Sequence, residues 1–176
     1  HRTNLYMGSI RNTTHAFVCG GYSGPGYGTS PGNKYDVIER FSLTAPHAGA
    51  DVGEMTVIKD TGAQITDGTK GLLCGGESAP DAQTDTIEQF TLGGSPITAT
   101  DTSSELSIII DQIGTVSDAP AAKGYIVGGR GGSPVDFIDK IEGVPIGISP
   151  GGSTSDYGEL GSGIAGTGAA GSPTHG

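Results

Sequence analysis

Short apolar runs that end in two glycines occur three times along the chain. The copies lie roughly 53 to 55 residues apart. They are Phe17-Val18-Cys19-Gly20-Gly21, Leu72-Leu73-Cys74-Gly75-Gly76 and Tyr125-Ile126-Val127-Gly128-Gly129. A fixed period of about 50 residues, with several short strands in each unit, predicts an array of repeated β units.

A segment of alternating apolar and polar residues follows each diglycine after a variable loop. The copies run from Asp36 to Leu43, from Asp85 to Leu92 and from Asp136 to Ile141, so that Ile38, Ile87 and Ile138 correspond. A period of two predicts a β-strand, with Ile38, Phe41 and Leu43 on a packed surface. The slip between the isoleucine and the phenylalanine predicts a β-bulge.

Two further landmarks complete each copy. An acid, a short turn, a second acid and a large apolar residue begin at Asp51, Asp101 and Asp156, and a basic residue precedes each diglycine, as His15, Lys70 and Lys123. His175 repeats this basic position near the last residue. We therefore divide the chain into a leading strand over 1–14 that completes a preceding or terminal unit, three repeats over 15–69, 70–122 and 123–174, and the start of a truncated fourth repeat at 175–176.

Composition agrees with short strands joined by turns. Glycine supplies 33 of the 176 residues, and helical periodicity is weak throughout. We expect an all-β chain. Glycine at a strand end is otherwise destabilising, so its recurrence indicates a close backbone approach or a positive φ. The structural glycines of the repeat are Gly20, Gly21, Gly75, Gly76, Gly128 and Gly129.

The charge limits the partners. A formal net charge of −10 disfavours nucleic acid and anionic membranes, because a phosphate backbone would be repelled. No stretch approaches the roughly 18 apolar residues of a membrane helix, so membrane insertion is not expected. Because the chain begins with His1 and ends within a repeat, we expect a processed or partial segment of a longer protein.

The ordered landmarks resemble the Kelch repeat. The diglycine, the Ile-Glu-x-Phe segment and the run from Ala50 to Met55 are most similar to Kelch-like arrays of phages and bacterial surface proteins. The resemblance implies β-propeller blades of about 50–55 residues. Two features depart from the family: the chain has no Trp, and three repeats are too few to close a ring. The resemblance therefore implies an incomplete ring or part of a larger propeller.

Catalytic motifs are weak, and we expect no enzyme activity, catalytic residue, metal or cofactor. Cys19, Cys74 and Val127 share one repeat position, which is interpreted as a small buried apolar site, with a disulfide or a metal pair as alternatives. The repeated basic residues are interpreted as ion-pair partners of the repeated acids at Asp51, Asp101 and Asp156 or Glu54, Glu105 and Glu159. Asp67-Gly68-Thr69 is interpreted as a turn and not as part of a calcium loop.

The loop after the first diglycine holds the candidate binding residues. It is long, polar and rich in Gly, and it carries three of the six Tyr. Exposed aromatic rings beside hydrogen-bonding groups suit a sugar or a protein surface. The candidates are Tyr22, Tyr27, Asn33 and Tyr35. A tolerated insertion without a binding role is the alternative.

These observations favour a non-enzymatic structural or attachment protein, a virion component that displays loops on a rigid β scaffold. The expected partners are other protein subunits, through self-association or a larger assembly, and a glycan, and the expected location is the virion or the extracellular space. One alternative is a bacterial extracellular adhesin or surface module. Another is part of a propeller enzyme whose active residues lie outside this segment.

Overall fold

The structure is a computed structural model that describes residues 8–23, 33–45, 49–60, 62–78, 82–132 and 134–166. Within these ranges the regular structure consists of strands, and no helix is present. The all-β prediction is therefore confirmed. Three principal sheets share one pattern, in which four antiparallel strands pair in the order in which they follow along the chain.

The first sheet contains four antiparallel strands in chain order and a fifth that joins in parallel. Its antiparallel strands are β1 (Gly8–Arg11), β2 (His15–Cys19), β5 (Val37–Ser42) and β6 (Ala50–Glu54). The outer edge of β6 is covered by β13 (Ile97–Thr98), a short strand contributed by a later part of the chain.

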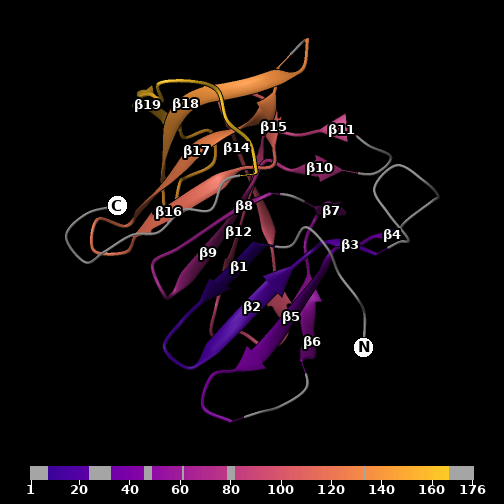
Figure 1. Ribbon diagram of the computed structural model, residues 1–176. Coiled ribbons are helices and arrows are strands. Elements are labelled where there is room, and N and C mark those ends of the chain that lie inside the picture. Colours follow the sequence, from indigo (N-terminus) through magenta and orange to yellow (C-terminus); the bar gives the residue numbers. More distant parts are fainter. Residues whose placement is uncertain are drawn as a thin grey trace.

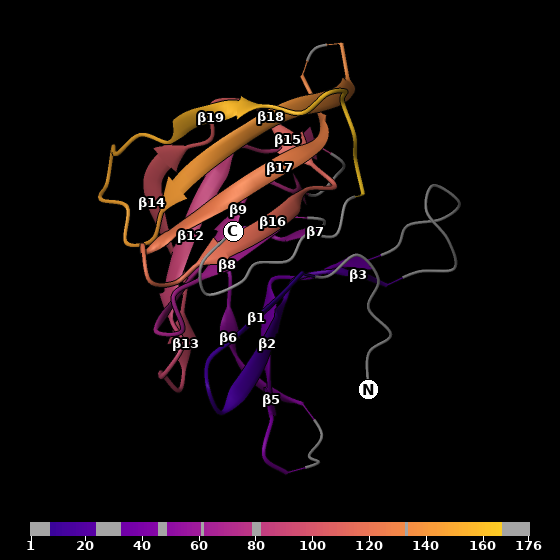
Figure 2. The ribbon, with the colours of Figure 1, turned by 60° about the vertical axis from the view of Figure 1, so that its left-hand side comes forward.

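The second and third sheets repeat this order. The second sheet contains β8 (Ala63–Thr66), β9 (Lys70–Cys74), β12 (Thr86–Thr91) and β14 (Thr100–Glu105). The third sheet contains β16 (Gly114–Asp118), β17 (Lys123–Gly131), β18 (Asp136–Pro145) and β19 (Ser155–Glu159), with β15 (Ile110–Asp111) on the far end of β17. Figure 2 shows β16, β17, β18 and β19 side by side in this order.

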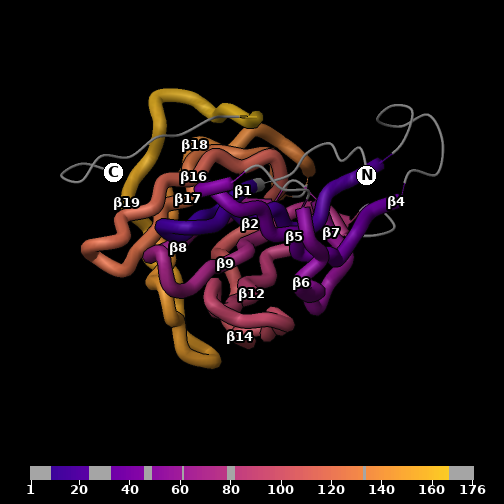
Figure 3. Tube along the Cα trace, turned by 90° about the horizontal axis from the view of Figure 1, so that it is seen from below, coloured from indigo at the N-terminus to yellow at the C-terminus, as the bar shows by residue number. Residues whose placement is uncertain are grey.

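The three sheets form a fan. Their first strands, β1, β8 and β16, lie next to one another, and each sheet runs outward from there (Figure 3). The first sheet lies at the bottom of Figure 1 and the third at the top, with the second between them. The first and third sheets are therefore the two ends of the fan.

Apolar side chains fill the two spaces between neighbouring sheets. One cluster joins the first and second sheets and includes Phe17, Ile38, Leu73 and Phe90. The other joins the second and third sheets. Its members include Ile65, Leu72, Ile87, Ile126 and Val144. Each strand of the second sheet can contribute to both clusters because successive side chains point to opposite faces.

The strand pairing corrects the alignment of the third repeat. Ile38 lies opposite Cys19 and Ile87 lies opposite Cys74, but the residue opposite Val127 is Ile141. Ile138 instead lies opposite Gly129. The third copy of the second strand therefore matches three residues later than the sequence comparison predicts, because β17 and β18 extend beyond the diglycine as a longer hairpin.

The predicted bulge is confirmed at one position in all three sheets. The register against the outer strand shifts between Ile38 and Glu39, between Thr86 and Glu88, and between Ile141 and Glu142. The prediction for Leu43 is wrong, because its side chain is 50% exposed, whereas the corresponding Leu92 is buried. Leu92 lies in the cluster between the first and second sheets, whereas Leu43 belongs to an end sheet of the fan.

Candidate functional site

The first two diglycines directly follow β2 and β9, whereas the third lies inside β17, where the pairing with β18 shifts register. The φ angles are +67° and +107° at Gly20 and Gly21, and both values are positive again in the other two copies. The second glycine of each pair donates its N–H to the carbonyl of a residue further along the chain. The three bonds are Gly21 to Lys59, Gly76 to Ile110 and Gly129 to Ile164. A positive φ favours glycine because it has no Cβ, and a Cβ on Gly20 would lie 2.3 Å from the carbonyl oxygen of Lys59.

The loops that follow the diglycines gather along one edge of the molecule, which we call the loop edge. It contains β3 (Tyr22–Ser23) paired with β4 (Asn33–Lys34), and β10 (Glu77–Ser78) between β7 (Lys59–Asp60) and β11 (Ala82–Gln83). These short strands lie on the right in Figure 1, with β15 nearby. Residues 22, 77 and 130 come directly after the three diglycines.

Charged side chains join the loops at this edge. Lys34 Nζ lies 2.7 Å from Glu77 Oε1, and Arg130 Nη2 lies 3.1 Å from Glu77 Oε2. Arg130 also binds Asp111 through two hydrogen bonds, Nε to Oδ1 at 3.0 Å and Nη2 to Oδ2 at 2.5 Å. Gln83 Nε2 donates to Asp111 Oδ1 at 3.0 Å. This network of Lys34, Glu77, Asp111 and Arg130 links loops from all three sheets.

The network holds the loops in fixed positions because most of its side chains are buried. Asp111 is fully buried, and Lys34 and Glu77 are nearly so, whereas Arg130 is partly exposed. A buried charge is costly unless it is paired and hydrogen-bonded, and the two-point contact of a guanidinium with a carboxylate also sets its orientation. The loop edge therefore has a rigid base. Nothing in the sequence analysis singled out these four residues, because they are far apart along the chain.

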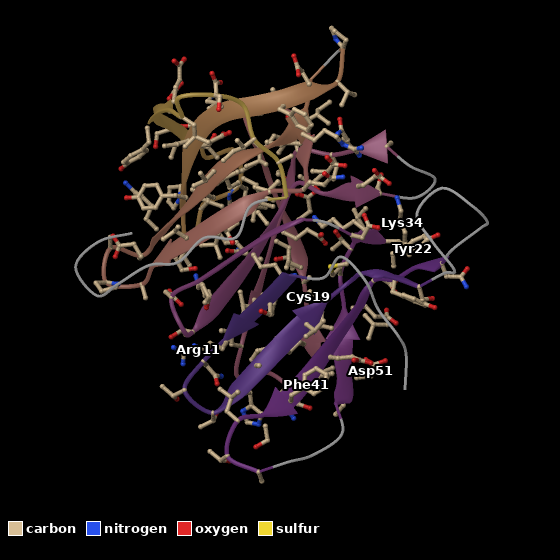
Figure 4. All side chains as sticks on the ribbon, viewed as in Figure 1. Arg11, Cys19, Tyr22, Lys34, Phe41 and Asp51 are labelled. Atoms are coloured by element: carbon tan, nitrogen blue, oxygen red, sulfur yellow. The ribbon has the colours of Figure 1, made fainter. Side chains whose placement is uncertain are left out.

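The structure places three of the four candidate binding residues. Tyr22 is buried, so its side chain packs inside the protein beneath the β3–β4 hairpin and offers little surface to a ligand. Asn33 is exposed, and the half-buried Tyr35 shares a 2.7 Å hydrogen bond between its hydroxyl and Ser23 Oγ. Figure 4 shows Tyr22 and Lys34 on the loop edge. Tyr27 lies outside the described residues.

Two buried glutamates connect neighbouring sheets. The N–H and the hydroxyl of Thr56, which follows β6, both donate to Glu88 Oε1 at 2.5 Å, and Lys59 Nζ lies 2.8 Å from Glu88 Oε2. Glu142 repeats this contact one sheet further. The N–H of Ser107, which follows β14, donates to its Oε1 at 2.7 Å, and the Ser107 hydroxyl donates to its Oε2 at 2.9 Å.

We call Glu88, Glu142 and the corresponding Glu39 the inter-sheet glutamates. Each of them directly follows the isoleucine at the bulge. The sequence analysis missed this role because it aligned the third copy on Ile138. The dipeptides Ile38-Glu39, Ile87-Glu88 and Ile141-Glu142 are the signal that could have revealed it.

The repeated acids hold turns. An Oδ1 atom accepts the N–H of the residue two positions later at Asp51, Asp101 and Asp156. In the described part of the chain, no ion pair joins these acids or Glu54, Glu105 and Glu159 to His15, Lys70 or Lys123, so the predicted repeated ion pairs are wrong there. His175 lies outside that part. Lys123 instead donates a hydrogen bond to the Tyr157 hydroxyl, which lowers the pKa of that phenol.

The turn interpretation of Asp67-Gly68-Thr69 is confirmed. The N–H groups of Thr69 and Lys70 both donate to Asp67 Oδ1 at 2.7 Å, and Gly68 has a positive φ of +85°. No group of three or more His, Cys, Asp or Glu side chains among the described residues is placed to hold a metal ion.

Cys19 and Cys74 are buried free thiols in different apolar clusters, which confirms the small buried apolar site. Burial raises the pKa of Cys74 to about 12 and raises the pKa of Cys19 well above its ordinary value.

Because the thiolate is the reactive form, we expect neither cysteine to react with a disulfide reagent at pH 8 in the folded protein. Unfolding in urea should release both thiols. Rapid colour formation with Ellman's reagent before unfolding would contradict this expectation.

Comparison with protein-family models gives no match to this chain, and comparison with curated protein sequences gives none. The described part of the chain contains no helix that could span a membrane.

Proposed function

We propose that this chain is a non-enzymatic structural or attachment protein whose three sheets are Kelch-like propeller blades. It would serve as a virion component that presents its loop edge to a host glycan or to a neighbouring subunit, in the virion or the extracellular space. The observation that carries the proposal is the buried network of Lys34, Glu77, Asp111 and Arg130. It supports loops from all three sheets on one rigid base.

The physical advantage of such a base is low entropy loss on binding. Loops that are already held in place lose less conformational freedom when they meet a partner. Once one copy of the scaffold has bound, the effective concentration of the neighbouring copies near the same surface is high. Several weak contacts would then give a strong overall affinity. The mechanism is multivalent surface recognition without bond making.

The binding role can be tested on an array of bacterial surface polysaccharides. We expect the labelled protein to bind a subset of them, and Asn33→Ala together with Tyr35→Ala to weaken binding by about tenfold, as for contacts at the centre of an interface. Thr13→Ala is the matched control, because Thr13 is exposed on the turn between β1 and β2, away from the loop edge. Equal loss in both variants, or no binding to any polysaccharide or host-cell surface, would refute the binding role.

The virion assignment has its own measurement. Quantitative mass spectrometry of purified particles should find the chain at a fixed copy number per virion. Adhesion to a sugar surface without virion association would favour the adhesin alternative. Turnover of a glycan by the longer protein that contains this segment would favour the enzyme alternative.

A further inference from the structure

The interface between the first and second sheets and the interface between the second and third sheets are built from equivalent residues. At each one, an inter-sheet glutamate of the later sheet accepts hydrogen bonds from Thr56 or Ser107, the second residue after the outer strand of the earlier sheet. The apolar residue before that donor is buried both times, as Met55 and as Leu106. The earlier sheet thus provides one face and the later sheet provides the complementary face.

The third sheet carries the first of these faces, and no further sheet in the described ranges packs against it. Tyr157 is 50% exposed, whereas the matching Val52 and Thr102 are buried. Ile164 is 38% exposed, whereas the matching Lys59 and Ile110 are buried. Leu160, the counterpart of Met55 and Leu106, is only half-buried. We call this surface, formed by Tyr125, Tyr157, Leu160, Gly161 and Ile164, the tail face.

The first sheet carries the complementary face, and none of the other described sheets packs against it. The carboxylate of Glu39 has no hydrogen-bond or ion-pair partner among the described residues and is half-buried, whereas Glu88 and Glu142 are fully or almost fully buried. Val18 and Phe41 flank Glu39 and are half-buried (Phe41 is labelled in Figure 4). Their counterparts Leu73, Phe90, Ile126 and Val144 are all buried. We call Val18, Glu39 and Phe41 the head face.

We propose that the head face binds the tail face of a second copy of this chain. Glu39 would take the place of Glu88 and Glu142, and the N–H of Gly161 would take the place of the Thr56 and Ser107 N–H groups. Gly161 occupies the matching position, is exposed, and its N–H has no acceptor among the described residues. Gly161 has no hydroxyl to match those of Thr56 and Ser107. The next residue, Ser162, is also exposed and would supply a hydroxyl.

The geometry favours a second copy because the two faces already fit each other twice within one chain. Such a contact joins different surfaces of the two copies, and contacts of this kind form rings when the rotation closes. Two copies joined at both pairs of ends would place six sheets, three from each, around one axis. This number lies within the range of four to eight blades found in propellers. The inference concerns the ends of the fan and is independent of what the loop edge binds.

The first test is the mass of the chain in solution. We expect light scattering coupled to size-exclusion chromatography to give a dimer. Glu39→Gln should raise the dimer dissociation constant by about tenfold or more, because an amide replaces a charged acceptor. Glu105→Gln is the matched control, because Glu105 is exposed on β14 and lies outside both faces. A monomer at all concentrations would overturn the proposal and would leave the ends to another repeat or another protein.

A mixing experiment tests the head-to-tail arrangement. Val18→Arg blocks the head face and Leu160→Arg blocks the tail face, so each variant alone should be monomeric. Mixing the two should restore a dimer, because one intact head then meets one intact tail. Recovery on mixing also shows that both variants are folded. Disruption by only one of the two variants, or no recovery from two variants with intact circular dichroism spectra, would overturn the proposed arrangement.

Discussion

Replacing Glu88 with alanine is expected to lower the free energy of unfolding by about 3 to 5 kcal/mol. The carboxylate is fully buried and pairs with Lys59, which is itself buried, so the substitution leaves an ammonium group without its counter-charge. The N–H of Thr56 also loses its acceptor. The measurement is urea denaturation followed by circular dichroism, at a fixed protein concentration.

Two controls isolate the cause. Glu105→Ala removes an exposed glutamate from β14 and should change the free energy of unfolding by less than about 0.5 kcal/mol. Replacing both partners, as Lys59→Met with Glu88→Leu, should recover much of the loss, because an apolar pair needs no compensation for buried charge. If Glu88→Ala costs no more than Glu105→Ala, the inter-sheet glutamates do not hold the sheets together.

The second large effect is expected for Gly76→Ala, at about 2 to 4 kcal/mol of destabilisation. Gly76 has a φ of +104°, and an added Cβ would lie 2.5 Å from the carbonyl oxygen of Asp60. A positive φ costs a residue with a side chain about 1 to 2 kcal/mol, and crowding against a backbone atom adds a similar amount. Thermal and urea unfolding of the purified variant measure the change.

Two other glycines separate these contributions. Gly68 has a φ of +85° and open space around its Cβ position, so Gly68→Ala should cost only the conformational part, about 1 to 2 kcal/mol. Gly93 has open space and no positive φ, so Gly93→Ala should be neutral or slightly stabilising. The predicted order of destabilisation is Gly76, then Gly68, then Gly93. Equal costs at Gly76 and Gly68 would show that the close approach to Asp60 is unimportant.

Local patterns were sufficient to predict the second and third strands of each principal sheet and the positive φ angles at the diglycines. Period-two alternation depends on residues that are neighbours in the sequence, and a Gly pair reports directly on the backbone. The bulge after Ile38 and Ile87 was predictable for the same reason, since a slip in the pattern is a local feature. The third copy was misaligned because Asp136-Phe137-Ile138 and Asp139-Lys140-Ile141 both fit the Asp-x-Ile spacing, although only Ile141 is followed by Glu. The pairing of Val127 with Ile141 identifies the second of these segments as the equivalent one.

The candidate site was less predictable because it depends on contacts between distant residues. Arg130 and Glu77 are partners across two sheets, and no pattern within either repeat indicates that they meet. The contact between Glu88 and Thr56 could not be predicted from the sequence either, because a glutamate in an amphipathic strand is ordinarily expected to face solvent. Burial of that side of the strand is a property of the stacked sheets, not of one repeat.

The parallel contact between β13 and β6 has a consequence for how such chains behave when crowded. An uncovered edge strand offers free N–H and C=O groups to any extended segment and is a common starting point for aggregation. Here Ile97 and Thr98 occupy the edge next to Gly53 and Glu54, and Gly53 has no side chain to keep Ile97 away. Many copies could therefore be packed at high density without the first sheet recruiting strands from its neighbours.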